Sequence, residues 1–567
     1  MPLLRALQRQ LDLQHALHGR FAFHLLLLLL LLTGGMSWLL LPGLVPGDDI
    51  HFHLHRLEWL AEGLRLGAGA RPVDTSVLGG AGYALGLFYS DVLLYPTALL
   101  RALGLPLVPL VKGLLLAVSL GSGASAFWCA WRLSRSPFGG LAAGLLYGWS
   151  SYLATDMLNR FALGETLAFP FVPLALLGWH ECVRGEWRRF PLLAIGVSGV
   201  LLAHNLTAVQ LCLALALLTA LSCRRLWHEP RRLGALALAA LLTLLWTACY
   251  VAPLLEQMLD QPFVVGTLGP RDLGWRAMPP HRLLVGSWLD TRPTGGGHVW
   301  MPPGLGLPLV AVSALGLLRR RRDPLLWTGL ALTALSTTLF PWSATTVQRS
   351  FLASFQFPWR FLLLGTALLS VAGGVTLAAT VGTSWVRQRR WLPWLVGACG
   401  VIWLSNVVQN ECRTTWRVQS AARLDSPEAG TLHYLPAVLT EDAVRQRLPL
   451  GVVTLRGTTT GAVVETDPTG ALTLRTAGGA GELELPRVAY LGYEAVDADG
   501  GRHPVGRSAD GFLTVRVPAE PCRLRIRYAG TTLRRLAALV SLVSVALAAL
   551  VWAIRRKSRT DTDIVAD

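Results

Sequence analysis

The chain has 567 residues, of which 52% are hydrophobic and only 15% are charged. Soluble domains average about a quarter charged residues, so the composition excludes an ordinary soluble protein. The net charge is +17, but the basic residues come in short clusters between apolar runs. That pattern is typical of the cytoplasmic loops of a polytopic membrane protein and argues against a nucleic-acid partner.

The first apolar run, near residues 22–42, is longer than the core of a signal peptide, and no small-residue cleavage site follows it. We interpret it as a retained membrane helix; a cleaved signal peptide is the alternative. Arg5, Arg9 and Arg20 precede the run, which places the N-terminus in the cytoplasm.

Apolar runs long enough to cross a bilayer recur along the chain, and each pair of basic clusters encloses an even number of them. The sequence therefore predicts an α-helical polytopic membrane protein of about 12 spans, with both termini in the cytoplasm. The predicted spans lie near residues 22–42, 107–131, 139–156, 164–182, 191–204, 207–223, 234–254, 304–318, 325–341, 360–384, 391–408 and 532–554.

These spans define a transmembrane domain over 1–408, an extracytoplasmic domain over 409–531, a last span over 532–554 and a cytoplasmic tail over 555–567. The extracytoplasmic domain alternates apolar and polar residues in "GVVTLRG", "GALTLRT", "GELELP", "GFLTVRV" and "CRLRIRY". Turn signals such as "TDPTG" and "DADGG" separate these segments, which predicts an antiparallel β-sandwich. Cys412 and Cys522 bracket the domain on the oxidising side, where they could form a disulfide.

The first outer loop, 43–106, begins with the acidic pair of "PGDDIHFHLHRLEWLAEGLRLG". From Ile50 onward, apolar residues recur at helical spacing, which predicts an amphipathic helix lying along the outer membrane surface. Asp48 or Asp49 would cap the start of this helix. His51 and His55 lie one turn apart, so a zinc site completed by an aspartate is an alternative.

Ionisable side chains at membrane depth or at its edge are costly, so each is a candidate functional residue. The topology gathers several on the outer face: Asp48, Asp49, Asn159, Arg160, Glu165, His204, Asn205, Gln356 and Arg360. Carboxylates can accept a proton or bind a metal, and arginines can hold a phosphate with two hydrogen bonds. Simpler roles stay open: the arginines as interface anchors, Glu165 as a helix-dipole partner and His204 as a turn residue.

A long outer loop after helix one that begins with an acidic pair resembles the GT-C superfamily of membrane glycosyltransferases. More closely, "GLFYSDVLLYPTALL", "NRFALGE", "HNLT", "FQFPWRF", "HYLPA" and "YAGTTL" resemble the bacterial YfhO-like membrane proteins over nearly the whole chain. The most specific parts are "FQFPWRF" and the spacing of Asp49, His53 and Arg56. Where this group often has His-Asp, the chain has Asp48-Asp49, which leaves open which aspartate acts.

The resemblance implies a GT-C-type enzyme in the bacterial plasma membrane. It would move a sugar from a polyprenyl-phosphate donor to a glycan, lipid or protein acceptor at the outer face. Asp49 would remove the acceptor proton, with Asp48 as its alternate or as a metal ligand. Arg160, Arg360 and His204 would hold the lipid phosphate, and Gln356, His53 and Arg56 would add substrate contacts. Glu165 would orient the acceptor or help to hold Mg²⁺ or Mn²⁺, for which Asp48 and Asp49 are the candidate ligands.

Two other functions compete with this one. A transporter or a lipid or glycan flippase would suit twelve spans, but such proteins more often show internal repeats and polar residues near mid-membrane. A scaffold that presents the β-sandwich outside the cell is the other alternative. No Gly-rich dinucleotide motif follows a strand and no P-loop is present, which disfavours a nucleotide-sugar donor.

Overall fold

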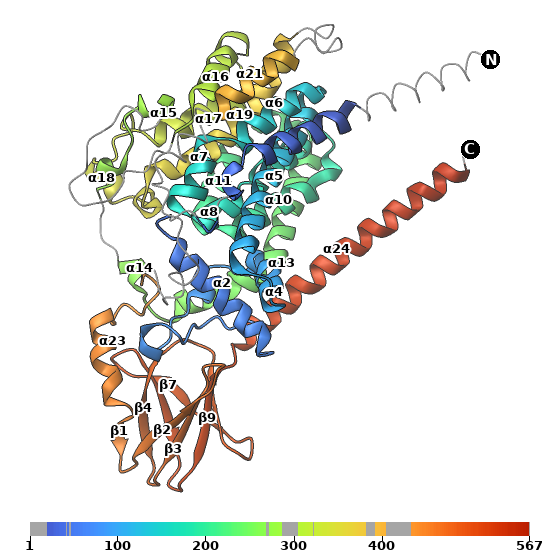
Figure 1. Ribbon diagram of the computed structural model, residues 1–567. Coiled ribbons are helices and arrows are strands. Elements are labelled where there is room, and N and C mark those ends of the chain that lie inside the picture. The colour runs from blue at the N-terminus through green and yellow to red at the C-terminus, as the bar shows by residue number, and fades with distance from the viewer. Residues whose placement is uncertain are drawn as a thin grey trace. The chain divides into compact units, whose positions relative to one another are not determined.

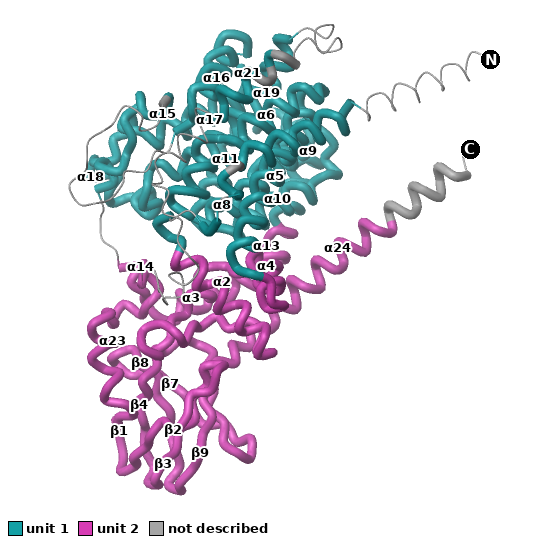
Figure 2. The backbone as a smooth tube through the Cα atoms, viewed as in Figure 1, with its two compact units in different colours: residues 1–50, 106–240, 270–424 teal, residues 51–105, 241–269, 425–567 magenta. Residues whose placement is uncertain are grey.

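The computed structural model describes residues 20–40, 42–44, 47–267, 272–285, 304–320, 322–381, 392–403 and 432–565 (Figure 1). The chain divides into two compact units, coloured separately in Figure 2. The first comprises residues 1–50, 106–240 and 270–424 and is helical; the second comprises residues 51–105, 241–269 and 425–567 and carries all the described strands.

The helices of the first unit overlap the predicted apolar runs, but some end earlier than predicted: the run at 22–42 is α-helical only to Gly34, and the run at 325–341 only to Leu335. They are a helix over Arg20–Gly34, α5 (Leu107–Ser134), α6 (Pro137–Gly148), α7 (Ser151–Ala154), α8 (Leu163–Ala168), α9 (Phe171–Val183), α10 (Phe190–Ala203), α11 (Asn205–Ala220), α12 (Cys223–His228), the start of α13 (Pro230–Asp260), α15 (Arg282–Val285), α16 (Leu307–Arg319), α17 (Pro324–Leu335), α18 (Thr345–Gln348), α19 (Phe361–Thr380) and α21 (Leu392–Ile402).

Small residues allow these helices to approach one another closely. A Cβ added at Gly178 of α9 would lie 2.1 Å from the backbone N of Leu193 in α10, and one added at Gly196 of α10 would lie 2.3 Å from the backbone N of Ala175. Small-residue interfaces of this kind are how apolar helices pack in a bilayer, where no hydrophobic effect drives them together.

Five helical segments among the described residues are long and apolar enough to cross a membrane. They cover Leu107–Ser134, Leu163–Val183, Pro230–Asp260, Pro358–Thr380 and Thr532–Ile554, and five shorter apolar helices accompany them. The architecture is therefore mostly helical with membrane-length segments, while the count of twelve spans stays a prediction.

The second unit begins with the predicted amphipathic helix, α2 (Ile50–Arg65). It starts at Ile50, as the apolar spacing predicted. Ile50, Leu54, Leu57 and Ala61 form the apolar stripe, and none is more than 2% exposed. The apolar face that the spacing predicted is therefore present and buried, while its place on the membrane surface stays a prediction. Sequence periodicity identifies an apolar face but not what covers it.

The other helices of the second unit are, in chain order, α3 (Leu85–Phe88), α4 (Tyr95–Ala102), the end of α13, α14 (Val264–Thr267), α23 (Glu441–Arg447) and α24 (Thr532–Val565). The loop after α2 shares one core with the strands: Tyr83 and Phe88 pack in the same cluster as Val488 and Phe512. This explains why residues 51–105 group with the C-terminal part of the chain, a grouping that the sequence did not predict.

The predicted β-sandwich is confirmed. Its strands are β1 (Val453–Gly457), β2 (Gly461–Thr466), β3 (Leu472–Thr476), β4 (Gly481–Val488), β5 (Tyr493–Val496), β6 (Arg502–His503), β7 (Val505–Arg507), β8 (Phe512–Val517) and β9 (Arg523–Tyr528). They form two antiparallel sheets, with strand orders β1-β4-β8-β7 and β2-β3-β9-β5-β6. Leu474 and Leu524 of one sheet share a core with Leu483 and Val515 of the other.

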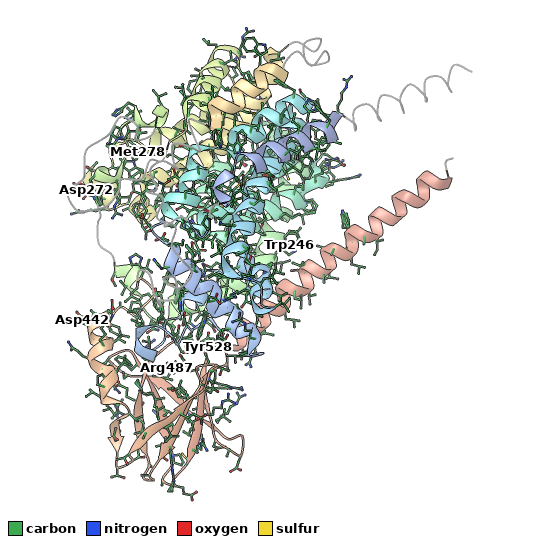
Figure 3. The ribbon with its side chains drawn as sticks, in the orientation of Figure 1. Trp246, Asp272, Met278, Asp442, Arg487 and Tyr528 are labelled. Atoms are coloured by element: carbon green, nitrogen blue, oxygen red, sulfur yellow. The ribbon has the colours of Figure 1, made fainter. Side chains whose placement is uncertain are left out.

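One close approach joins the loop after α2 to the sandwich. Gly82 has φ +86°, and a Cβ there would lie 3.4 Å from Cδ of Arg487, a residue of β4 that is 1% exposed (Figure 3). The left-handed backbone at Gly82 is one that glycine adopts without strain. A larger residue would be strained by this backbone and would press against Val73, whose Cγ1 would lie 3.1 Å from the added Cβ.

Candidate active site

A buried carboxylate, Glu165 of α8, lies at the centre of the predicted outer cluster. It is 1% exposed, and its Oε1 accepts hydrogen bonds from Nη2 of Arg160 at 2.9 Å and from Nε of Arg360 at 2.7 Å. Its Oε2 accepts from the hydroxyl of Tyr152 at 2.8 Å and from Nη1 of Arg160 at 3.0 Å. Four donors satisfy a carboxylate that is ionised, so this group holds two arginines in fixed positions.

The chain reaches Arg160 through an unusual backbone. A single π-helical turn, Thr155–Arg160, follows α7, and Phe161 then takes a left-handed conformation with φ +51°. Such a conformation costs a bulky residue about 1–3 kcal/mol and persists only where the surroundings enforce it. The π-turn also places Asp156, which is fully buried, 2.5 Å from Nη1 of Arg160.

The second arginine is held by a similarly strained segment. Gln356 has φ +64°, and its Oε1 accepts a hydrogen bond from Nη1 of Arg360 at 3.0 Å. Pro358 then starts the short 3₁₀ helix Pro358–Arg360 that leads into α19. The Arg276 guanidinium lies over the ring of Phe357, 4.5 Å from its centre, and donates to the Gln356 carbonyl at 3.0 Å. Gln356 of the "FQFPWRF" stretch therefore helps to hold Arg360 against Glu165.

Backbone hydrogen bonds fix the acidic pair beside Arg160. The N–H of Asp48 donates to the Asn159 carbonyl at 3.1 Å, and that of Asp49 donates to the Arg160 carbonyl at 2.9 Å. Gly47 makes this approach possible, because a Cβ there would lie 2.6 Å from Cβ of Phe161. Asp48 and Asp49 are both exposed, in contrast to the buried network behind them.

The environment of Asp49 changes its proton affinity. Although the side chain reaches solvent, desolvation by the surrounding protein is the largest effect and raises the pKa of the Asp49 carboxyl above its ordinary value. The positive charge of Arg160 opposes this rise, and the negative charge of Asp48 adds to it. A raised pKa brings a carboxylate closer to the range in which it can act as a general base.

His204 lies at the junction of α10 and α11 and is buried. Its Nδ1 caps α11 by accepting a hydrogen bond from the N–H of Thr207 at 3.3 Å, so the turn role that the sequence left open is present. His204 also interacts electrostatically with Glu165, Arg360 and Arg160, which places it at the edge of the same network.

His53 and Arg56 belong to another network, within the second unit. Nε of Arg56 donates to Asp91 Oδ1 at 2.7 Å and its Nη2 donates to the Ser90 carbonyl at 2.6 Å. His53 is 3% exposed and meets the ring of Tyr89. Because a protein carboxylate already neutralises Arg56, these contacts favour a structural role over the predicted substrate contact.

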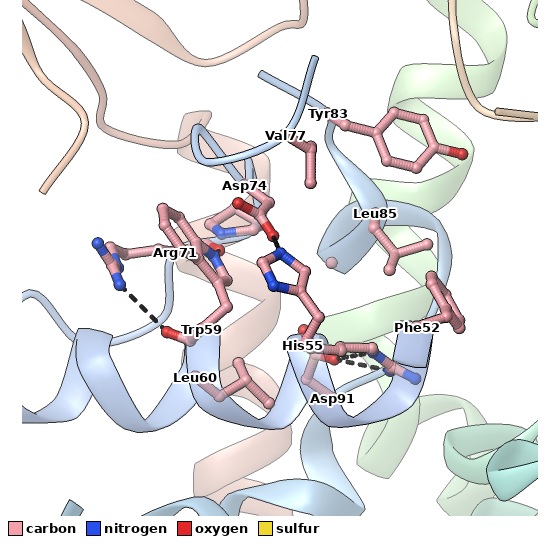
Figure 4. Close-up of a pocket in the computed structure, with 13 residues that line it drawn as sticks. Phe52, His55, Trp59, Leu60, Arg71, Asp74, Val77, Tyr83, Leu85 and Asp91 are labelled. Atoms are coloured by element: carbon pink, nitrogen blue, oxygen red, sulfur yellow. Dashed lines mark hydrogen bonds and ion pairs between the residues drawn. The ribbon is translucent and has the colours of Figure 1, made fainter. Parts of the chain in front are cut away.

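The alternative of a zinc site at His51 and His55 concerns the same helix, and His55 has a carboxylate partner there. Nε2 of His55 lies 2.8 Å from Oδ2 of Asp74, beside a small pocket in which the Arg71 guanidinium covers the ring of Trp59 at 3.7 Å (Figure 4). Within the described ranges, no group of three or more His, Cys, Asp and Glu side chains is placed to hold a metal ion. A zinc site ordinarily takes three or four protein ligands, whereas Mg²⁺ commonly takes one or two carboxylates and completes its shell with water and phosphate, so the acidic pair stays a candidate for Mg²⁺ or Mn²⁺.

Two network members, Asp156 and Tyr152, were not predicted. Asp156 precedes Arg160 by four residues, a spacing that pairs opposite charges on a helix and could have identified it. Nothing local marks Tyr152, since its partner Glu165 lies beyond the π-turn. Cys412 lies outside the described residues, so its disulfide with Cys522 stays a prediction.

The sequence matches no protein-family model and no curated protein. Among solved structures, the chain is similar to arabinofuranosyltransferase AftD from Mycobacteria, with 14% identity, TM-score 0.42, and coverage of 70% of this chain and 27% of that one. It is also similar to ArnT from Cupriavidus metallidurans bound to undecaprenyl phosphate, with 15% identity, TM-score 0.39, and coverage of 67% of this chain and 64% of that one. A third similar structure is the Archaeoglobus fulgidus oligosaccharyltransferase, with 11% identity, TM-score 0.38, and coverage of 70% of this chain and 56% of that one. The chain spans less than two-thirds of each, and likeness at this level assigns no activity.

Proposed function

We propose that this protein is a membrane glycosyltransferase that moves a sugar from a polyprenyl-phosphate-linked donor to an acceptor at the outer membrane face. The observation that carries the proposal is the hydrogen bond from the Asp49 N–H to the Arg160 carbonyl. It holds an exposed carboxylate beside two arginines that a buried glutamate fixes in place. An inverting transfer needs this combination: a base for the acceptor proton and cations for the departing phosphate.

Asp49 is the proposed base. Its side chain reaches solvent, where an acceptor hydroxyl can approach, and its raised pKa suits proton removal. Asp48 is the alternate, because it is also exposed and adjacent. Its negative charge raises the pKa of Asp49, so it contributes even where it takes no proton.

Arg360 and Arg160 are the proposed phosphate ligands, with His204 beside them. Nε and Nη1 of Arg360 donate to protein acceptors, whereas no hydrogen bond joins its Nη2 to any residue that the structure describes. That edge is where a donor phosphate would bind. Glu165 is inaccessible to an acceptor and its oxygens are satisfied, so we assign it a positioning role in place of the predicted catalytic one.

Binding of a divalent cation at the acidic pair is a further part of the proposal. Asp48 and Asp49 supply oxygen ligands of the kind that Mg²⁺ and Mn²⁺ prefer, but a bound cation would take its other ligands from water and from the donor phosphate. No step proposed here depends on it. The assignments to a YfhO-like group, to the bacterial plasma membrane and to cytoplasmic termini likewise remain proposals from the sequence.

The direct test uses the purified full chain, a polyprenyl-phosphate sugar and mixed acceptors, with release or transfer of the sugar as the readout. The wild type should turn over the donor, and Asp49→Asn should not. Full activity in an Asp48→Asn/Asp49→Asn double variant would overturn the proposed base. Movement of the intact donor across a vesicle bilayer without sugar release would favour the flippase alternative instead.

A further inference from the structure

A basic cavity in the first unit is not used by the proposed reaction. It holds about 640 Å³ and is lined by Arg184, Arg319, Arg320 and Arg322, with an apolar wall that includes Leu133 and Val375. A cavity of this size accommodates a headgroup-sized ligand. Its residues come from segments far apart in the sequence that meet at one end of the helices.

The cavity lies at the opposite helix ends from the candidate active site. Val375 follows Arg360 by fifteen residues along one continuous helical segment, a separation of about 22 Å at 1.5 Å per residue. Likewise, Glu165 is near the start of the segment Leu163–Val183, and Arg184 directly follows its end. The cluster of arginines at this end is one that the positive-inside rule assigns to the cytoplasm.

The charges of the cavity are only partly neutralised from within. Nη1 of Arg320 lies 2.8 Å from Asp323, whose Oδ1 also caps the start of α17 by accepting from the N–H of Leu325. No ion pair within the part of the chain that the structure describes involves Arg184, Arg319 or Arg322. Three like charges beside one cavity repel one another, and an anion there would remove that repulsion.

The apolar wall of the cavity favours a lipid over a soluble anion as its ligand. Leu133 lies at the end of the candidate span Leu107–Ser134, and Leu318 of α16, also on the cavity, is 71% exposed. These apolar side chains are next to the arginines, at the depth where a helix leaves the hydrocarbon core. Basic pockets between helices at this depth match the phosphate and the first acyl carbons of a phospholipid.

We propose that this cavity binds the phosphodiester headgroup of an anionic membrane phospholipid, with Arg184, Arg319 and Arg322 as its phosphate ligands. The acyl chains would lie against the apolar wall. This inference is independent of the proposed glycosyl transfer, because it concerns other residues at the other end of the helices.

The test compares retained lipids by native mass spectrometry of the purified full chain in neutral detergent, titrated with phosphatidylglycerol or phosphatidylcholine. We expect the wild type to prefer phosphatidylglycerol by about tenfold or more, equivalent to 1.4 kcal/mol or more. Arg184→Gln/Arg319→Gln/Arg322→Gln should abolish that preference. Its charge-matched control removes three exposed arginines that do not line the cavity, Arg188→Gln/Arg224→Gln/Arg231→Gln, and should keep the preference within about twofold.

A second variant, Leu133→Trp, fills the cavity without changing the charge and should also reduce the preference. If thermal unfolding shows that the triple variant is not folded, the lipid preference of Leu133→Trp decides whether the cavity is the binding site. Equal losses in the two triple variants would overturn the proposal in favour of unspecific attraction. Displacement of the lipid by millimolar inorganic phosphate would overturn it in favour of a soluble anion.

Discussion

Nε of Arg360 donates to Oε1 of Glu165 at 2.7 Å, although 195 residues separate the two in the sequence. Both side chains are buried. Removing one partner of a buried ion pair leaves an uncompensated charge, which typically costs about 3–5 kcal/mol. Glu165→Gln should therefore lower the free energy of unfolding by about that amount, measured by thermal or denaturant unfolding in detergent.

The matched control for this loss is Glu186→Gln. Glu186 also pairs with an arginine, Arg189, at 2.7 Å, but its side chain is 48% exposed. Exposed ion pairs are worth about 0–1 kcal/mol because water solvates both groups. Equal destabilisation by the two substitutions would contradict the positioning role of Glu165.

The two adjacent aspartates should differ in their effect on catalysis. Asp49→Asn removes the proposed base and should reduce kcat by about 10²- to 10⁴-fold, the usual range for general base catalysis. Asp48→Asn should retain most of the activity. Steady-state kinetics with a polyprenyl-phosphate sugar measures both, and the reverse order of effects would assign the base to Asp48.

The pH dependence tests the same assignment independently. A base acts when it is deprotonated, so kcat/KM should fall as the pH drops through the pKa of Asp49, which lies above the ordinary value for aspartate. Because the negative charge of Asp48 raises that pKa, Asp48→Asn should move the acidic limb to lower pH. An acidic limb that does not move, or moves upward, argues against Asp49 as the titrating group.

Donor binding should depend on the shape of the Arg360 side chain as well as on its charge. Arg360→Lys keeps one positive charge but loses the planar fork that binds Glu165 and, in the proposal, a phosphate. We expect KM for the donor to rise by about tenfold or more, consistent with the loss of one charge-assisted hydrogen bond. Arg349→Lys, at an exposed position, is the control and should leave KM unchanged.

A turn in the β-sandwich offers a stability test that is separate from the active site. Oδ1 of Asp467 accepts from the N–H of Thr469 at 2.8 Å and from that of Ala471 at 3.1 Å, and its Oδ2 pairs with Arg525 at 2.7 Å. Asp467→Ala should destabilise the sandwich by about 1–3 kcal/mol, seen as faster amide hydrogen exchange in β2 and β3. Asp499→Ala, at an exposed turn position, is the control.

Local patterns predicted the secondary structure well, because apolar periodicity and turn residues act over a few neighbouring positions. The five alternating segments became β1, β3, β4, β8 and β9. Four strands were missed: β2, β5, β6 and β7. The last three have only two to four residues each, which carry too little alternation to detect. The described apolar runs likewise became helices, although the ends of some fall six to eight residues short of those predicted.

The sequence by itself determined which polar residues were out of place in an apolar chain, namely Asp49, Arg160, Glu165 and Arg360, because the cost of burying charge does not depend on the fold. Only the tertiary structure decided which of them are buried in the ion-pair network and which are exposed. Glu165 is buried between the two arginines while Asp49 stays exposed, and this follows from contacts between distant segments that no local pattern encodes. For the same reason, the partner of Arg56 and the burial of the apolar stripe of α2 became known only with the folded chain.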